Sequence, residues 1–138
     1  MTIPYRLFKI ETKQFAMFPE LFSSGEEATV DTELSFAPST DRTNIRSIVT
    51  LKYKQGECLL MVLELACFFE IASEGWEEMK KDGRWVVPVD FLRYMGTIVV
   101  GTARGVLHTK TEGTVLNACL LPPINVAELV KEDFIVKQ

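Results

Sequence analysis

The chain has 138 residues, 47% of them hydrophobic, and a formal net charge of −4 with acidic and basic residues interspersed. This length and composition predict a single domain over residues 1–138 with a compact core, and they exclude wholesale disorder. The mixed charge argues against a nucleic-acid-binding protein, because such proteins usually carry a basic stripe.

The first residues, MTIPYRLFKIE, lack the basic, apolar and small-residue regions of a secretory leader, so we expect a cytoplasmic protein. The three cysteines, Cys58, Cys67 and Cys119, are scattered and form no CxxC pair. Only His108 could join them, and a structural zinc site needs four closely spaced ligands. We therefore expect no metal and no other cofactor, with the cysteines as free thiols in a reducing compartment.

The first half of the chain predicts strands. Residues 5–18 are mostly extended and stop at Pro19, and residues 28–36 alternate between apolar and polar side chains. Residues 42–54 form a third strand, which a tight glycine-containing turn at residues 54–57 joins to the next segment.

That next segment, residues 56–72, contains thirteen apolar side chains among seventeen. A membrane span is improbable because Glu57, Glu64 and Glu70 interrupt it. Every odd position from Leu59 to Ile71 is apolar, whereas the even positions are mixed. This alternation predicts a strand with one face in the core, and short connections between the four strands indicate an antiparallel meander.

The second half predicts helices. Residues 73–82 form a charged loop with at most a short helical turn, and residues 88–110 have the apolar spacing of an amphipathic helix. Gly96, Gly101 and Gly105 each weaken that helix by up to ~1 kcal/mol, but they allow another backbone to approach at an intersubunit or helix–sheet contact. A short helix follows at residues 125–130, with Asn125 as its N-cap.

No catalytic set emerges, so we expect a protein that is not an enzyme. The glycines of GTARG, residues 101–105, lack the spacing of a phosphate-binding loop. Glu64 and Glu70 would lie ~20 Å apart on a strand, too far for a glycosidase pair. His108 falls in the last turn of the long helix, where positive charge complements the helix dipole.

Surplus apolar surface is the main functional signal. The even face of the fourth strand carries apolar side chains that need to be covered, namely Leu60, Val62, Ala66 and Phe68. A second group of apolar residues clusters around the first turn and consists of Phe15, Met17, Phe18, Leu21 and Phe22. A monomer of this size rarely leaves such patches bare. We expect either oligomerisation, with an interface at Leu60, Val62, Gly96 and Gly101, or binding of apolar segments of other proteins.

Four short motifs carry a resemblance to the SecB chaperone family. Residues 9–15, KIETKQF, before Pro19 resemble the I-x-T-K signature of its first strand, and residues 69–72, FEIA, resemble the F-x-I-A end of its fourth. Arg104-Gly105 resembles the R-G pair that ends the family's long helix. Residues 121–125, LPPIN, are similar to the L-x-P-x-N segment before its last helix. The similarity spans roughly residues 5 to 132.

The resemblance implies an α+β fold with a four-stranded antiparallel sheet, a crossover after the first strand, one long helix and one short helix. It also implies a homotetramer, a dimer of dimers, that acts as an ATP-independent chaperone and holds unfolded polypeptides in apolar surface grooves. The groove positions of the family correspond here to Phe18, Leu21, Phe22, Phe68, Phe69, Leu129, Val130 and Phe134.

The chain also departs from the family pattern. The last helix is short, ending near Phe134, and the zinc-binding tail that docks the export motor SecA is missing, which argues against SecA docking and against a role in protein export. SecB-like relatives also act as chaperones of antitoxins, a role that needs no such tail. A small-molecule or lipid carrier, using the same apolar surface as a closed pocket, is the alternative function.

Overall fold

The computed structural model describes residues 3–136. Four long strands form an antiparallel sheet in the order β1-β4-β3-β2. They are β1 (Tyr5–Met17), β2 (Thr29–Pro38), β3 (Asn44–Gln55) and β4 (Cys58–Ile71). The expected α+β fold with a four-stranded antiparallel sheet is therefore confirmed.

The position of β1 corrects the meander that the residue pattern indicated. Strands β2, β3 and β4 do form a meander, but β1 pairs with β4 on the far side of the sheet. The chain crosses from β1 to β2 through a short 3-10 helix, η1 (Pro19–Leu21), as the crossover implied by the family resemblance requires. Local alternation of side chains defines a strand but carries no information about which strand lies beside it.

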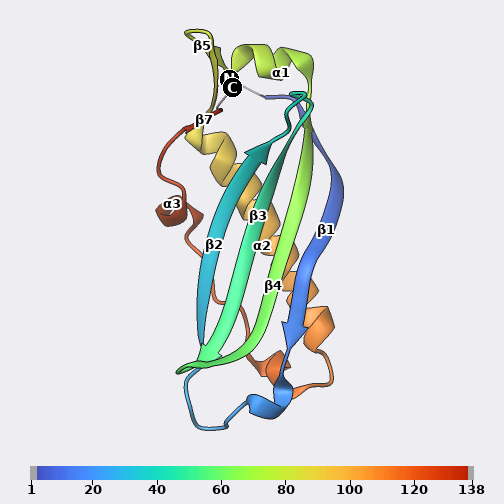
Figure 1. The fold of residues 1–138 in the computed structure, drawn as a ribbon, viewed down its shortest axis with the longest axis vertical. Helices are drawn as coiled ribbons and strands as arrows, with labels where there is room; N and C mark the ends of the chain where they lie inside the picture. Colours follow the sequence, from blue (N-terminus) through green and yellow to red (C-terminus); the bar gives the residue numbers. More distant parts are fainter. Residues whose placement is uncertain (1–2, 137–138) are drawn as a thin grey trace.

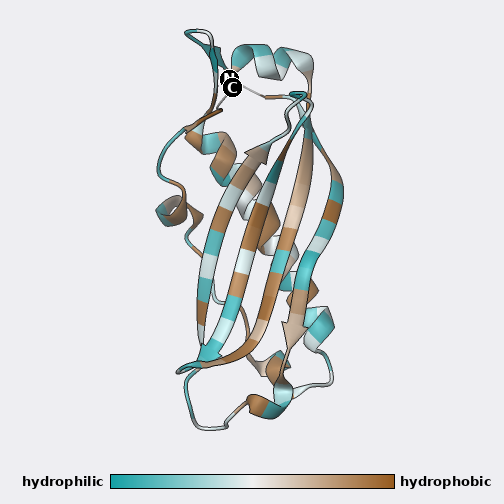
Figure 2. Ribbon diagram, in the orientation of Figure 1, coloured by the Kyte–Doolittle hydropathy of each residue, from teal (hydrophilic) through white to brown (hydrophobic). Residues whose placement is uncertain are grey.

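A single long helix, α2 (Val89–Thr111), crosses one face of the sheet diagonally (Figure 1). The core lies between the two layers. On β3 and β4 it takes the predicted faces, because Ile45, Val49 and Leu51 of β3 are completely buried, as are Leu63 and Leu65 of β4. Figure 2 shows β4 hydrophobic along most of its length, whereas the edge strands β1 and β2 alternate between hydrophobic and hydrophilic residues.

The segment between β4 and α2 is more structured than the predicted loop. It contains the short helix α1 (Ser73–Glu78) and a two-strand ribbon, β5 (Lys80–Lys81) and β6 (Arg84–Val87). Trp76 of α1 is 4% exposed and belongs to the core, which explains why this charged stretch is ordered.

After α2 the chain returns alongside β2 (Figure 1). It passes through η2 (Val115–Ala118) and α3 (Val126–Leu129) and ends the described region in β7 (Phe134–Ile135), which pairs with β6. Asn125 caps α3 as predicted, since its side chain accepts a hydrogen bond from the Ala127 amide at 3.1 Å. The last helix, however, ends at Leu129, so Phe134 lies in a strand and not at a helix end.

Candidate functional site

An open groove runs between β2 and the segment that follows α3. Its central part has a volume of about 580 Å³ and combines apolar side chains with the polar residues Ser35, Lys131, Glu132 and Asp133. We call it the β2 groove and define it by its apolar lining, which consists of Leu34, Phe36, Leu92, Leu129, Val130 and Phe134.

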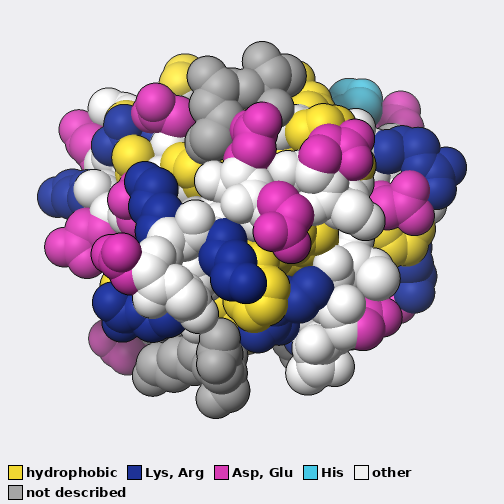
Figure 3. Space-filling view, turned by 90° about the horizontal axis from the view of Figure 1, so that it is seen from above, with side chains coloured by type: hydrophobic (Ala, Val, Ile, Leu, Met, Phe, Trp, Pro, Cys, Tyr) yellow, Lys and Arg dark blue, Asp and Glu magenta, His cyan; other side chains and the backbone are white. Residues whose placement is uncertain are grey.

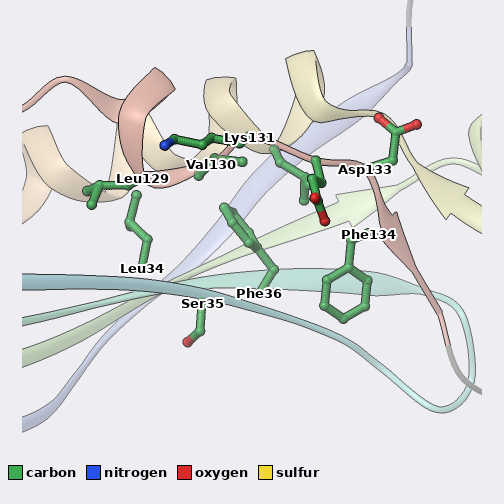
Figure 4. A pocket seen from close by; sticks show the side chains of 10 residues that line it. Leu34, Ser35, Phe36, Leu129, Val130, Lys131, Asp133 and Phe134 are labelled. Carbon is green, nitrogen blue, oxygen red and sulfur yellow. The ribbon is translucent and has the colours of Figure 1, made fainter.

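Strand β2 forms one wall of this groove. Because side chains alternate along a strand, Leu34 and Phe36 project to the same side, and Figure 4 shows them pointing toward Leu129 and Val130 while Ser35 points away. The pairing of β2 with β3 continues without interruption from Thr29 to Pro38. This wall is therefore a regular row of half-buried apolar side chains.

The opposite wall is a nonhelical segment held in place by a few polar contacts with α2. The Arg93 Nε donates to the Val130 carbonyl at 2.8 Å, and the Val89 amide donates to Asp133 Oδ1 at 2.8 Å. At the end of the segment, the Val136 amide donates to the Trp85 carbonyl at 2.9 Å. These contacts anchor the segment to α2 and β6.

The groove extends in both directions along β2. Toward the β2–β3 turn, Phe36 and Phe134 also line a hollow of about 840 Å³ that reaches Pro38 and Arg42. Toward the start of β2, Leu129 also lines a hollow of about 580 Å³ that reaches Val30. Residues 30–38 of an extended strand span ~30 Å, so the groove has room for roughly nine extended residues.

The backbone edge of β2 lies beside this groove. Within residues 3–136, β2 is hydrogen-bonded to β3 on one side and has no strand partner on the other. An edge strand of this kind presents unpaired N–H and C=O groups that can pair with an added strand. The site thus combines apolar pockets with backbone hydrogen-bonding groups, the two elements of β-strand addition.

Three of the expected groove residues meet in this site. Leu129, Val130 and Phe134 all line the β2 groove. Leu129 is 43% exposed, whereas Val130 is 6% exposed and also contributes to the core, so Leu129 offers the larger accessible surface.

The structure places the other expected groove residues elsewhere. Phe18, Leu21 and Phe22 lie around η1, at the opposite end of the sheet from β7 (Figure 1), and among them Leu21 is exposed. Phe68 is partly buried on the sheet face away from α2, where its ring lies 6.1 Å from that of Phe8. Phe69 is completely buried in the core and offers no surface to a peptide.

Three of the four expected interface residues are buried within the single chain, and one is exposed. Leu60 and Val62 are buried within the single chain, at 0% and 6% exposure. Gly96 serves the helix–sheet contact, since a Cβ there would lie 3.1 Å from Val126 and 3.3 Å from Leu34. Gly101 is exposed, and a Cβ there would meet nothing within 4 Å, so it remains a candidate for contact with another subunit.

Sequence reasoning missed Leu34, Phe36 and Leu92 as groove residues. The alternation in β2 correctly placed Leu34 and Phe36 on one face, but that signal cannot show that β2 is an edge strand with a groove beside it. Leu92 has the spacing of a core-facing helix residue, and it is 2% exposed at the base of the groove.

Within residues 3–136, no group of three or more His, Cys, Asp or Glu side chains is placed to hold a metal ion. Cys58, Cys67 and Cys119 are free thiols, and burial raises the pKa of Cys67 and of Cys119. In the same described range, no helix is long and apolar enough to cross a membrane.

Comparisons with known proteins bear on the fold. No protein-family model matches the chain, and no curated protein sequence matches it. Among solved structures, it is similar to the Mycobacterium tuberculosis Rv1957 SecB-like chaperone, solved in complex with a ChAD peptide from the Rv1956 HigA1 antitoxin. The identity is 14% and the TM-score is 0.53, over 90% of this chain and 89% of that one. The chain therefore has a SecB-like fold.

Proposed function

We propose that this protein is an ATP-independent chaperone that holds extended segments of unfolded polypeptides in the β2 groove. The observation that carries the proposal is the coincidence, in a SecB-like fold, of an open apolar groove with an uninterrupted, unpartnered edge strand. Such a site selects clients by apolar side chains and by an accessible backbone, and both are features of unfolded chains.

The energetics suit reversible holding. A leucine or phenylalanine side chain of a client contributes about 1.5–3 kcal/mol when it is fully buried. Ordering the client and the loss of its translational freedom offset much of this gain. Two or three anchored side chains plus backbone pairing therefore give binding that is reversible without nucleotide hydrolysis.

The proposed client class is taken from the similar chaperone structure. The Rv1957 chaperone is bound to a peptide of an antitoxin. We extend this to antitoxin-like segments as clients of the present chain, alongside other unfolded chains such as preproteins, in the cytoplasm. Docking to SecA is no part of the proposal.

We further propose a homotetramer, a dimer of dimers. Apolar side chains remain exposed where β1 lies beside α2, because Ile10 and Tyr94 are both 51% exposed and Leu7 is 38% exposed. Contiguous apolar surface of this kind favours association between copies. Gly101 lies on α2 with open space above it, which allows a second helix to approach closely.

The carrier alternative requires an enclosed cavity. The β2 groove is open along its length, since it continues past Phe36 and Phe134 at one end and past Leu129 at the other. No observation favours the carrier over the chaperone.

Light scattering tests the proposal. A chemically unfolded client protein, diluted from denaturant without ATP, should aggregate less as this protein is added in increasing stoichiometric amounts. Native mass spectrometry of the same mixtures should show the oligomer with the client bound. A protein that leaves the aggregation curve unchanged and never appears with a client would contradict the proposal.

A further inference from the structure

Arg42 marks one end of the β2 groove. It lies in the turn between β2 and β3 and lines the hollow that Phe36 and Phe134 share with the groove. Among the residues of the described range 3–136 that line that hollow, it is the one charged side chain. The opposite end, near Val30, carries charges of both signs, including Asp31, Glu33 and Lys52. The groove is therefore electrostatically asymmetric.

Arg42 has no acidic partner within residues 3–136. Its Nη1 donates to the Ser39 carbonyl at 2.8 Å, and it takes part in none of the ion pairs of the described chain. The adjacent Asp41 is occupied elsewhere, because it accepts hydrogen bonds from the Ser39 and Thr43 hydroxyls at 2.7 and 2.8 Å. Those hydrogen bonds lower the pKa of Asp41 and keep its charge within the turn.

The Arg42 side chain is held in place before any ligand arrives. Its guanidinium lies 5.0 Å from the centre of the Trp85 ring, and the Lys80 ammonium lies 5.5 Å from the same ring. Figure 3 looks onto this end of the molecule and shows hydrophobic side chains bordered by Lys and Arg and also by Asp and Glu. A stacked guanidinium loses less conformational freedom when it binds an anion than a freely moving one does.

The backbone at Arg42 is also unusual. Its φ angle is 57°, in the left-handed region where glycine is the favoured residue. A side chain other than glycine costs stability there, and such outliers concentrate at functional positions. The turn thus carries a strained arginine beside a hollow in which no carboxylate of residues 3–136 pairs with it.

We propose that this end of the β2 groove binds the carboxylate of an acidic side chain of the client. The preferred client is then an extended apolar segment with an Asp or Glu at the end that reaches the β2–β3 turn. A guanidinium fits a carboxylate through two parallel hydrogen bonds, and the apolar surroundings strengthen that pair. This inference rests on the proposed chaperone function, which supplies the apolar part of the binding.

Fluorescence anisotropy with two labelled eight-residue peptides tests it. Both peptides alternate Leu or Phe with Ser or Thr and have blocked ends, and they differ only in one terminal Glu or Gln. Wild-type protein should bind the Glu peptide at least about tenfold more tightly, the lower end of the range for a hydrogen bond to a charged group. Added salt should reduce this ratio, because part of the pair is exposed.

Arg42→Gly is the decisive variant, since it removes the cation and relieves the strained φ angle. The Glu-to-Gln ratio should fall to about one in this variant while affinity for the Gln peptide is retained. Lys110→Gln is the matched control, because it removes a cation that also lies over an aromatic ring, that of Phe15, but near the other end of α2. This variant should retain the wild-type ratio of Glu-peptide to Gln-peptide affinity. Arg42→Lys should retain part of it, because charge remains but the planar fork is lost.

Equal affinity of wild-type protein for the two peptides would overturn the inference and leave the chaperone function intact, and this result depends on no variant folding. A preference for Glu that survives in Arg42→Gly would also overturn it. Absence of binding by either peptide would overturn the proposed function and the inference together.

Discussion

Strands β1 and β2 are the two edges of the same sheet, yet they differ in regularity. The pairing of β1 with β4 shifts register twice, between Leu7 and Lys9 and between Thr12 and Gln14. The pairing of β2 with β3 has no shift over its ten residues. Bulges blunt an edge against unwanted strand addition, so the contrast indicates that β1 is protected and β2 is left available.

Charge reinforces the difference. On β1, Glu11 lies between two lysines, with its carboxylate 3.3 Å from Lys9 and 2.9 Å from Lys13. Charged side chains are a common device against edge-to-edge pairing. At the β2 edge, the side chains of β2 that face the groove between Leu34 and Pro38 are apolar.

The largest expected effect comes from adding a charge at each edge. Leu129→Asp in the β2 groove and Phe8→Asp on β1 are well matched, because the two residues are 43% and 44% exposed. Leu129→Asp should weaken binding of an apolar extended peptide at least tenfold, since it removes ~1.5–3 kcal/mol of burial and adds an unpaired charge. Phe8→Asp should change the affinity less than twofold. Anisotropy titrations measure both, and equal effects would remove the distinction between the edges.

Backbone pairing at β2 can be tested on the peptide itself. An added strand directs alternate amides toward β2, so N-methylation of one alternate set should weaken binding about fivefold per methyl, and methylation of the other set should matter little. Competition titrations with the two methylated peptides distinguish the cases. Equal sensitivity of both sets would show that the groove binds side chains alone.

Two glycines of α2 extend the comparison to stability. Gly101→Ala should stabilise an isolated subunit by about 0.8 kcal/mol through helix propensity, because its Cβ meets nothing within 4 Å. Gly96→Ala should gain less or lose stability, because its Cβ presses on Val126 and on Leu34 in the groove wall. Urea unfolding gives both free energies, and peptide affinity should change only for Gly96→Ala.

The proposed tetramer gives Gly101→Ala a second readout. If α2 helices pack against each other at Gly101, the added methyl group should lower the oligomer mass at a given concentration even while the isolated subunit is stabilised. Analytical ultracentrifugation measures this, and an unchanged oligomer would place the subunit contact away from Gly101.

The smallest expected effect concerns the charges on β1. Lys13 and Lys9 lower the pKa of Glu11, so its pairing stabilises the fold above the ordinary glutamate pKa and is lost as the pH falls through the lowered value. Glu11→Gln should therefore reduce stability slightly at neutral pH and not at all in strong acid. High salt should erase the difference, which urea midpoints at two ionic strengths can measure.

The sheet core was predictable because its pattern is local and redundant. Seven consecutive odd positions of β4, from Leu59 to Ile71, are apolar, and a one-residue slip would expose all of them. The long helix was predictable for the same reason, and its observed bounds differ from the predicted ones by a single residue at each end.

The groove was only partly predictable because it depends on contacts between distant segments. Leu129 and Phe134 were expected from the family resemblance, but Phe36 becomes a groove residue only because the returning chain passes beside β2. The pairing of β6 with β7 was also not predictable, because it joins distant segments and a two-residue strand is too short to show a periodic pattern. Arg42 was predicted as the first residue of the third strand, whereas it lies in the turn before β3, and its positive φ angle cannot be read from residue type.

The position of Trp85 beneath Arg42 gives the molecule a built-in optical probe. Trp85 is partly buried at the end of the groove, whereas Trp76, 4% exposed in the core, is the other indole of the chain. An anion drawn to the cations over Trp85 changes the electric field across that ring and hence its emission wavelength. Trp76→Phe would leave a single emitter, and its spectrum would report occupancy without any attached dye.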